Sequence, residues 1–228
     1  EPFLIRGLIY RSMGEIERAK TDLFKAESLG ENTTVLFNAL GLWHSGLHQH
    51  EIALDYFCKA LSLNSGANSV AKIAFNASLS AMALGDFEKA WQFYSYRKYG
   101  TGVIEETTYA AWQGENLSGK HLVVRREQGL GDELRFSSVI AEVAEEARLI
   151  TLECDPRLVD LYQRSFPCNV ELVGVQVHGN AYVGVDCAAH IGDLSIYKRR
   201  SLDDFPEHYG YLQPDSKRVD YWTDYLHE

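Results

Sequence analysis

The chain has 228 residues, 46% of them hydrophobic and 24% charged, which is enough to build one large or two small domains without a disulfide or metal. This composition excludes a disordered tail, a collagen-like rod and a coiled coil, and no apolar run of about 18 residues predicts a membrane span. The net charge of −10 arises entirely in residues 101–228. It argues against nucleic-acid binding and suggests a domain boundary near residue 100.

The first hundred residues repeat. Positions separated by 34 residues match in three pairs: Gly7 and Gly41, Ala19 and Ala53, Ala26 and Ala60. Part of a third copy can be read from Gly85 to Ala90, and Ala90 lies 37 residues after Ala53, so three residues are inserted near 65–67. The pattern resembles the tetratricopeptide repeat, in which each unit is a pair of helices that bury their apolar faces by stacking. Residues 1–98 are therefore predicted to form about three helix pairs; the alternative is a plain helical bundle.

Tetratricopeptide arrays bind a peptide or protein in the groove formed by the first helix of each pair. The residues that the repeat phase places on that face are mainly apolar, with two amides that could bond a peptide backbone: Leu4, Leu8, Asn38, Leu42, Phe75, Asn76 and Leu79. The lysine and arginine set that grips a peptide carboxylate in chaperone-binding members is missing. The alternative is that this face packs against a neighbouring repeat outside the chain.

Neither the histidines nor the cysteines predict a metal site. His44 and His48 are four residues apart, but no Asp or Cys completes a set with them. We expect His44, His48 and His50 to be solvated histidines at a turn. The cysteines at 58, 154, 168 and 187 form no C-x-x-C pair, so we expect free, mostly buried thiols and a cytoplasmic location.

Residues 99–118 show no clear element and are predicted to be a linker. From residue 121 short apolar runs alternate with amphipathic helices, with strands expected at 122–124, 149–152, 170–173 and 181–185. Asp155 and Pro156 are a helix start. The predicted fold class is thus α plus α/β, in which helical repeats precede a Rossmann-like parallel α/β domain over 119–228.

A glycine-rich turn follows the first of these strands. Gln128, Gly129, Leu130 and Gly131 leave the strand and open a helix, where Rossmann-like folds bind phosphates, and the two glycines would allow backbone angles forbidden to other residues. One alternative is a tight turn without a ligand. Another is a dinucleotide site, for which Glu153 would be the ribose-binding acid, although the third glycine of that fingerprint is replaced by Leu134.

Two carboxylates accompany this turn. Asp132 stands in the first helical turn at the carboxyl edge of the sheet, and Glu127 lies on the same loop. Either could take a proton from an acceptor hydroxyl during group transfer. The alternative makes Asp132 a helix cap and Glu127 a loop anchor.

Longer strings add a second resemblance. They are Gly85-Asp86-Phe87-x-x-Ala90-Trp91, Glu127-Gln128-Gly129-Leu130-Gly131-Asp132-Glu133 and Leu152-Glu153-Cys154-Asp155-Pro156. They resemble bacterial tetratricopeptide-repeat proteins with a glycosyltransferase-like part, which is similar to heptosyltransferase-type enzymes of the two-Rossmann-domain, GT-B arrangement. This chain looks like the repeats plus the first such domain.

The resemblance implies a transfer of sugar from a nucleotide sugar to a glycan or protein acceptor, with no tightly bound cofactor and with Asp132 at the reaction centre. It also implies a second domain for the donor, and only sixteen residues follow Leu212, so we expect this chain alone to be inactive. His190 is either an acceptor-side residue or a loop histidine. Two other hypotheses stay open: a non-catalytic interaction module on an α/β platform, and a nucleotide-binding oxidoreductase.

Overall fold

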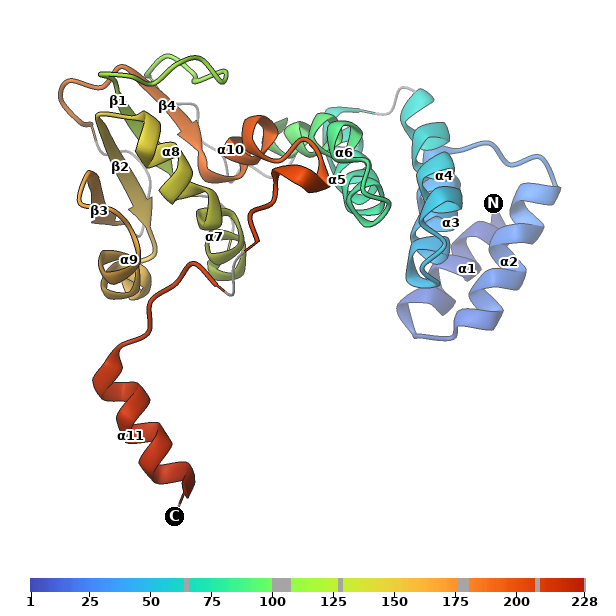
Figure 1. Ribbon diagram of the computed structural model, residues 1–228. Coiled ribbons are helices and arrows are strands. Elements are labelled where there is room, and N and C mark those ends of the chain that lie inside the picture. Colours follow the sequence, from blue (N-terminus) through green and yellow to red (C-terminus); the bar gives the residue numbers. More distant parts are fainter. Residues whose placement is uncertain (64–65, 100–107, 127–128, 176–180, 208–209, 228) are drawn as a thin grey trace. The chain divides into compact units, whose positions relative to one another are not determined.

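The computed structural model describes residues 1–63, 66–99, 108–126, 129–175, 181–207 and 210–227. It divides into two compact units, Glu1–Gly102 and Val103–Glu228 (Figure 1). The division falls inside the segment 99–118 that the sequence marks as a linker. In the described part of the chain, no helix is long and apolar enough to cross a bilayer.

The first unit consists of three antiparallel helix pairs, as the repeat predicts. Successive helices contact one another along the chain, from the first pair to the third. Thr33 caps one helix by accepting a hydrogen bond from the Leu36 N–H at 3.2 Å. The helices are α1 (Pro2–Ser12) with α2 (Ile16–Ser28), α3 (Thr34–Gly46) with α4 (His50–Ser62), and α5 (Ala67–Ala83) with α6 (Phe87–Tyr94), followed by the 3-10 turn Ser95–Tyr99.

Small residues hold the two helices of each pair close together. A Cβ atom added to Gly7 would lie 3.0 Å from the Leu23 side chain, and one added to Gly41 would lie 2.5 Å from the Phe57 ring. Leu23 and Phe57 are themselves 34 residues apart, so the same contact recurs in phase. In the third pair the place of these glycines is taken by the buried Ser78, whose Oγ donates to the Phe75 carbonyl at 2.7 Å.

We expect Gly41→Ala to destabilise the repeat unit by about 1–3 kcal/mol, because the new methyl group overpacks a fully buried ring. Gly46→Ala is the matched control, since it lies in the same helix and its added Cβ meets no described atom within 4 Å. Urea unfolding of both variants measures the difference. Equal stabilities would show that Phe57 moves aside freely.

The expectation of solvated turn histidines holds for His48 and fails for His44. His44 is buried inside α3, with Nδ1 2.7 Å from Gln49 Oε1 and its ring stacked on Tyr56 at 5.4 Å. His48 does lie in the turn, in the left-handed region at φ 59°, and His50 begins α4. The prediction for His44 was wrong because its position faces the aromatic side chains of neighbouring helices rather than solvent. Among the described residues, no cluster of three His, Cys, Asp or Glu could hold a metal.

The second unit is a four-stranded parallel sheet with helices. Its strands are β1 (His121–Arg125), β2 (Leu149–Cys154), β3 (Val170–Gly174) and β4 (Cys187–His190), in the order β3-β2-β1-β4. In register, Leu122 pairs with Ile150 on one side and with Cys187 on the other. The chain runs outward from β1 to β3 and then returns to the opposite side of β1, as in a Rossmann-like fold.

Helices and 3-10 turns connect and follow these strands. Strand β1 is buried at all five positions, as expected for a parallel strand covered on both faces. The connecting elements are α7 (Leu130–Phe136), Ser137–Val139, α8 (Ile140–Glu146), Pro156–Leu158, α9 (Val159–Ser165), α10 (Ile191–Lys198), Leu202–Asp204 and α11 (Ser216–His227) (Figure 1).

Three details correct the sequence analysis. The fourth strand is Cys187–His190 and not 181–185, where Val183 is fully exposed. Part of the supposed linker joins the sheet, because the Trp112 N–H donates to the Ala188 carbonyl at 2.8 Å. All four cysteines are free, but only Cys154 and Cys187 are buried, so the expectation of mostly buried thiols holds for half of them.

Candidate functional site at the carboxyl ends of β1 and β4

The strand order creates a switch point between β1 and β4, where connections leave in opposite directions. Strand β1 is followed by α7 and leads to β2 on one side. Strand β4, on the other side of β1, leads directly to α10. Arg125 and His190 pair in register as the last residues of the two strands, and α7 contacts α10. Open α/β sheets bind ligands in the crevice outside the carboxyl ends at such a point. Gly129, Gly131, Asp132 and His190 therefore belong to one edge of the sheet.

The two loop glycines are exposed and do not need the conformational freedom expected of them. Gly129 has an extended backbone (φ −102°, ψ 170°), and Gly131 lies within α7 without a positive φ. A Cβ added to either meets no described heavy atom within 4 Å. The expectation of forbidden backbone angles was wrong. The backbone at both glycines is instead accessible from solvent.

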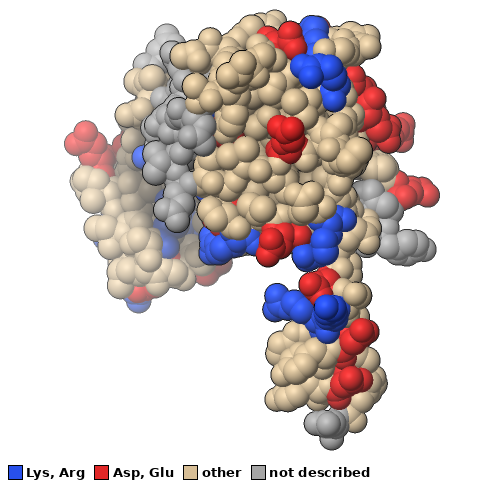
Figure 2. Space-filling model, turned by 90° about the vertical axis from the view of Figure 1, so that its left-hand side faces the viewer, with Lys and Arg blue, Asp and Glu red and all other residues tan. Residues whose placement is uncertain are grey.

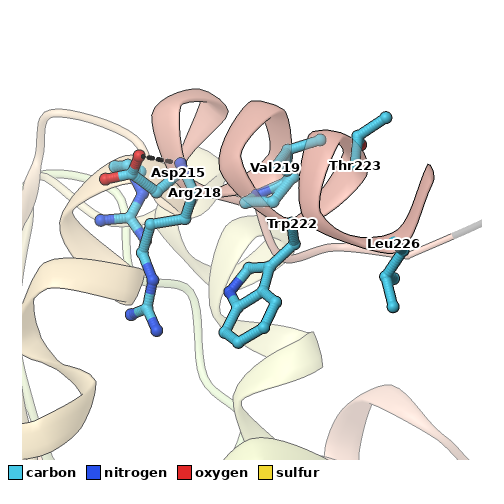
Figure 3. A pocket seen from close by; sticks show the side chains of 8 residues that line it. Asp215, Arg218, Val219, Trp222, Thr223 and Leu226 are labelled. Carbon is cyan, nitrogen blue, oxygen red and sulfur yellow. Dashed lines mark hydrogen bonds between the residues drawn. The ribbon is translucent and has the colours of Figure 1, made fainter. Parts of the chain in front are cut away.

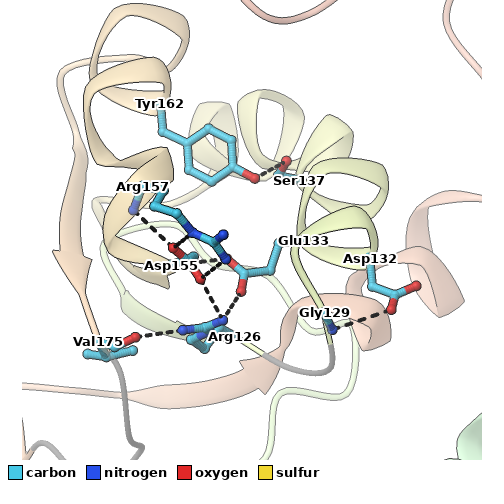
Figure 4. A network of polar contacts seen from close by, with 9 residues as sticks. All are labelled: Arg126, Gly129, Asp132, Glu133, Ser137, Asp155, Arg157, Tyr162 and Val175. Atoms are coloured by element: carbon cyan, nitrogen blue, oxygen red, sulfur yellow. Dashed lines mark hydrogen bonds and ion pairs between the residues drawn. The ribbon is translucent and has the colours of Figure 1, made fainter.

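Asp132 lies on the same helical turn, partly exposed. Its Oδ2 accepts a long hydrogen bond from the Gly129 N–H at 3.5 Å (Figure 4). The side chain therefore contributes to the start of α7 while still reaching solvent. Leu130 is the first residue of that helix. The other predicted loop residues, Glu127 and Gln128, lie outside the described residues.

Beneath this turn lies a charged network that the sequence analysis missed. Arg126, the residue after β1, places Nη2 2.6 Å from Glu133 Oε1 and 3.4 Å from Asp155 Oδ2. Its Nη1 donates to the Val175 carbonyl at 2.6 Å. One guanidinium thus joins the ends of β1, β2 and β3 to α7 (Figure 4). The available signal was a charged residue directly after each of two buried strands.

Glu133 is fully buried within this network. Its Oε2 accepts a hydrogen bond from the Asp155 N–H at 2.8 Å. Burial raises the pKa of the Glu133 carboxyl, against the lowering effects of that N–H and of Arg126. For Asp155, hydrogen bonds from Arg157 hold the pKa well below its usual range. The network therefore combines one desolvated carboxylate, Glu133, with one carboxylate, Asp155, whose charged form is stabilised by hydrogen bonds from Arg157.

A hydroxyl cluster fastens the later chain to the same helix. Ser137 Oγ donates to the buried Tyr162 hydroxyl at 2.9 Å and lies 2.8 Å from the Tyr211 hydroxyl. The Tyr211 hydroxyl also donates to the Leu134 carbonyl, and its ring stacks on Phe166. The contacts of Tyr211 join residues far apart along the chain and could not be predicted from the sequence.

Glu153 and His190 have different environments from those expected of ligand-binding residues. Glu153 is fully buried, with Oε1 3.3 Å from Arg125 Nη1 and 3.0 Å from the Tyr182 hydroxyl that donates to it. An acid held inside the sheet in this way is poorly placed to bond a ribose, which argues against the dinucleotide hypothesis. His190 is buried at the end of β4 and precedes α10, so it is not an exposed loop histidine.

The predicted groove residues divide into two groups. Leu4 is buried in the core with Leu23, and Leu8 and Leu42 pack partly against core clusters, so these three support the fold. The remaining four lie on α3 and α5 and are at least partly exposed: Asn38, Phe75, Asn76 and Leu79. Among them, Asn76 Nδ2 donates to Asn38 Oδ1 at 3.1 Å. The placement of Leu4 as a groove residue was wrong, because its side chain points into the pair.

The C-terminal helix α11 forms a separate open pocket with α9. The pocket has a volume of about 500 Å³ and is lined on one side by the helix face of Val219, Trp222, Thr223 and Leu226, and on the other by Arg164 (Figure 3). Asp215 accepts a hydrogen bond from the Arg218 N–H at 3.1 Å and so caps α11. In Figure 2 the uncharged side chains of this helix gather on one side and the acidic ones on the other. None of its described residues is buried.

One curated relative and two solved structures are similar to parts of the chain. No family model matches it. Protein FlbA of Caulobacter vibrioides is 28% identical over 185 residues, which are 72% of this chain and 31% of that protein, so the chain spans about a third of this curated relative. A solved chain of the APC/C hetero-tetramer Cut9–Hcn1 has a TM-score of 0.41 and 22% identity over 42% of this chain and 19% of its own. An O-GlcNAc transferase from Thermobaculum terrenum has a TM-score of 0.34 and 12% identity over 75% and 41%.

Proposed function

We propose that the repeat unit binds an extended peptide or protein segment along the face of α3 and α5. The observation that supports this most directly is the hydrogen bond between Asn38 and Asn76, which places two side-chain amides on adjacent first helices. The bond uses the carbonyl of Asn38 and the amide nitrogen of Asn76. The pair still offers the Asn38 amide and the Asn76 carbonyl, which are complementary to the acceptor and donor of a peptide backbone.

Apolar side chains flank this amide pair. Leu79 is 42% exposed on α5, one turn from Phe75, whose ring packs against Tyr94 at 6.1 Å. A bound segment would gain hydrogen bonds from the amides and apolar contact from these neighbours, a combination typical of peptide-binding surfaces. Because the amides contact backbone atoms, they set no strong requirement on the bound sequence.

Selection of peptides from a random library against the chain, followed by titration, tests this proposal. We expect Asn76→Ala to weaken binding of the selected peptides about 5- to 10-fold, as the loss of one or two hydrogen bonds does. Asn68→Ala is the matched control, because Asn68 lies exposed on the same helix. Peptides that bind both variants as tightly as the wild type would contradict the proposal.

For the α/β unit we propose a role in the transfer of sugar from a nucleotide sugar to an acceptor, with this unit on the acceptor side. The specific observation in favour is the open surface at Gly129 and Gly131 beside the partly exposed carboxylate of Asp132. In such a reaction the acceptor oxygen attacks the anomeric carbon, the nucleoside diphosphate leaves, and Asp132 accepts the hydroxyl proton. The repeat unit would then recruit the acceptor.

The full-length protein is the material for this second test. Release of nucleoside diphosphate from a panel of nucleotide sugars, with and without a peptide selected by the repeat unit, reports transfer. Stimulation by the peptide would link the two roles. Binding of the peptide without any release from any nucleotide sugar would favour the alternative, a non-catalytic interaction module on an α/β platform.

A further inference from the structure

The proposed peptide-binding face on α3 and α5 carries a single formal charge. Helix α3 contains no Asp, Glu, Lys or Arg, and α5 contains only Lys72. Lys72 is exposed and lies three residues before Phe75 and four before Asn76, so it shares their side of α5. A segment bound to the amides of Asn38 and Asn76 therefore lies close to an ammonium group and to no carboxylate of these two helices.

The other lysines and arginines of the repeat unit whose side chains the structure describes are each stabilised within the unit. Some of them pair with a carboxylate: Arg6, Arg18 and Lys89. Others lie over an aromatic ring: Lys20, Lys59 and Arg97. The rest lie in the last turn of a helix, where the helix dipole favours a cation: Arg11 and Lys25.

Lys72 has no such stabilisation from the residues that the structure describes. It forms no ion pair, hydrogen bond or ring contact with any of them, and it lies in the second turn of α5, far from the helix end that favours a cation. The equivalent position on α3 is Val35, 37 residues earlier, which is 53% exposed. At this end of the face one helix thus presents an apolar side chain, and the other presents an ammonium group that is available to a ligand.

We propose that the segment bound on this face carries an aspartate or glutamate whose carboxylate pairs with Lys72. This inference rests on the peptide binding proposed above. Side chains four apart on a helix are about 5–6 Å from each other, and an extended chain advances about 3.3–3.6 Å per residue. The acidic residue would therefore lie one or two positions from the backbone that contacts Asn76. The amides would hold the backbone, and Lys72 would select the sequence by charge.

Three versions of one selected peptide test this by titration: the peptide with its acidic residue, with the corresponding amide there, and with lysine there. We expect the wild type to bind the acidic version about 2- to 5-fold more tightly than the amide version, as for an exposed ion pair, and salt to reduce this preference. Lys72→Met keeps the aliphatic chain and should abolish the preference. Lys72→Glu should reverse it in favour of the lysine version, which also shows that the variant is folded.

Lys25→Met is the matched control, because Lys25 is an exposed lysine on α2, a second helix outside this face; the preference should persist. A preference that also persists in Lys72→Met would overturn the inference, and so would selected peptides without an acidic residue. Loss of the preference on amidation of the peptide's C-terminus would overturn it too, because the ligand would then be a terminal carboxylate.

Asn76→Ala separates this inference from the proposal on which it rests. Weaker binding of all three peptide versions by Asn76→Ala, with an acid preference that ignores Lys72, would overturn the charge selection and leave the peptide-binding face supported. Binding that does not respond to Asn76→Ala would contradict the face itself, and the charge selection with it.

Discussion

Arg126→Met is expected to lower the free energy of unfolding of the α/β unit by about 3–5 kcal/mol, as the loss of one partner from a buried ion pair does. The reason is that Glu133 is fully buried and its Oε1 lies 2.6 Å from the Arg126 guanidinium. Without that cation the carboxylate is left as a desolvated charge. Native-state hydrogen exchange of the β1 and β2 amides measures the change in this unit alone.

Arg157→Met provides the control for the first prediction. Arg157 also pairs with Asp155, at 2.8 Å, but its side chain is 71% exposed. Its loss should cost no more than about 1 kcal/mol, because solvent screens such pairs. The double change Arg126→Met with Glu133→Gln should cost less than Arg126→Met alone, since a neutral amide replaces the buried charge and still accepts from the Asp155 N–H. Similar losses for both arginine variants would contradict the role assigned to Glu133.

The repeats could be predicted because their signal is periodic and local. Gly7 and Gly41 recur after 34 residues, and each contacts the residue sixteen positions later on the second helix. The repeat period did not predict whether a particular side chain faces the core or the solvent. Leu4 and His44 both turned out to be buried, because helix pairs bury more of the first helix than the groove pattern alone indicates.

The strands that contain β-branched residues could be predicted from the sequence, and the strand built from small residues could not. Leu122 to Val124 form an obvious buried strand, but β4 has the sequence Cys187-Ala188-Ala189-His190, in which no residue favours a strand. Its pairing with β1 on one side, and with the segment around Ala111 on the other, decides its conformation. Such tertiary pairing leaves no local mark in the sequence.

At the candidate site the sequence identified the exposed residues and missed their support. Gly129, Gly131 and Asp132 form a short string that can be read directly. Arg126, Glu133 and Asp155 are separated along the chain and come together only when β1 and β2 pair. Charged residues that follow a buried strand usually lie in exposed surface loops. The sequence therefore did not indicate that these are buried.

Asp132→Asn is expected to reduce sugar transfer by the full-length protein about 10²- to 10⁴-fold, which is the usual contribution of a general base. The amide keeps an oxygen that can accept the Gly129 N–H bond, so α7 should begin as before. What the variant loses is the negative charge and the ability to hold the acceptor's proton. Release of nucleoside diphosphate, measured at saturating acceptor, separates this loss from weaker acceptor binding.

Asp160→Asn is the matched control, because Asp160 also lies in the first turn of a helix, α9, and is exposed. It should leave transfer unchanged. Peptide binding by the repeat unit should be the same in both variants, since Asp132 and Asn76 belong to different units. Unchanged turnover in Asp132→Asn would remove this carboxylate from the mechanism and leave it the role of a helix cap. A parallel loss of turnover and of hydrogen-exchange protection would instead assign the effect to folding.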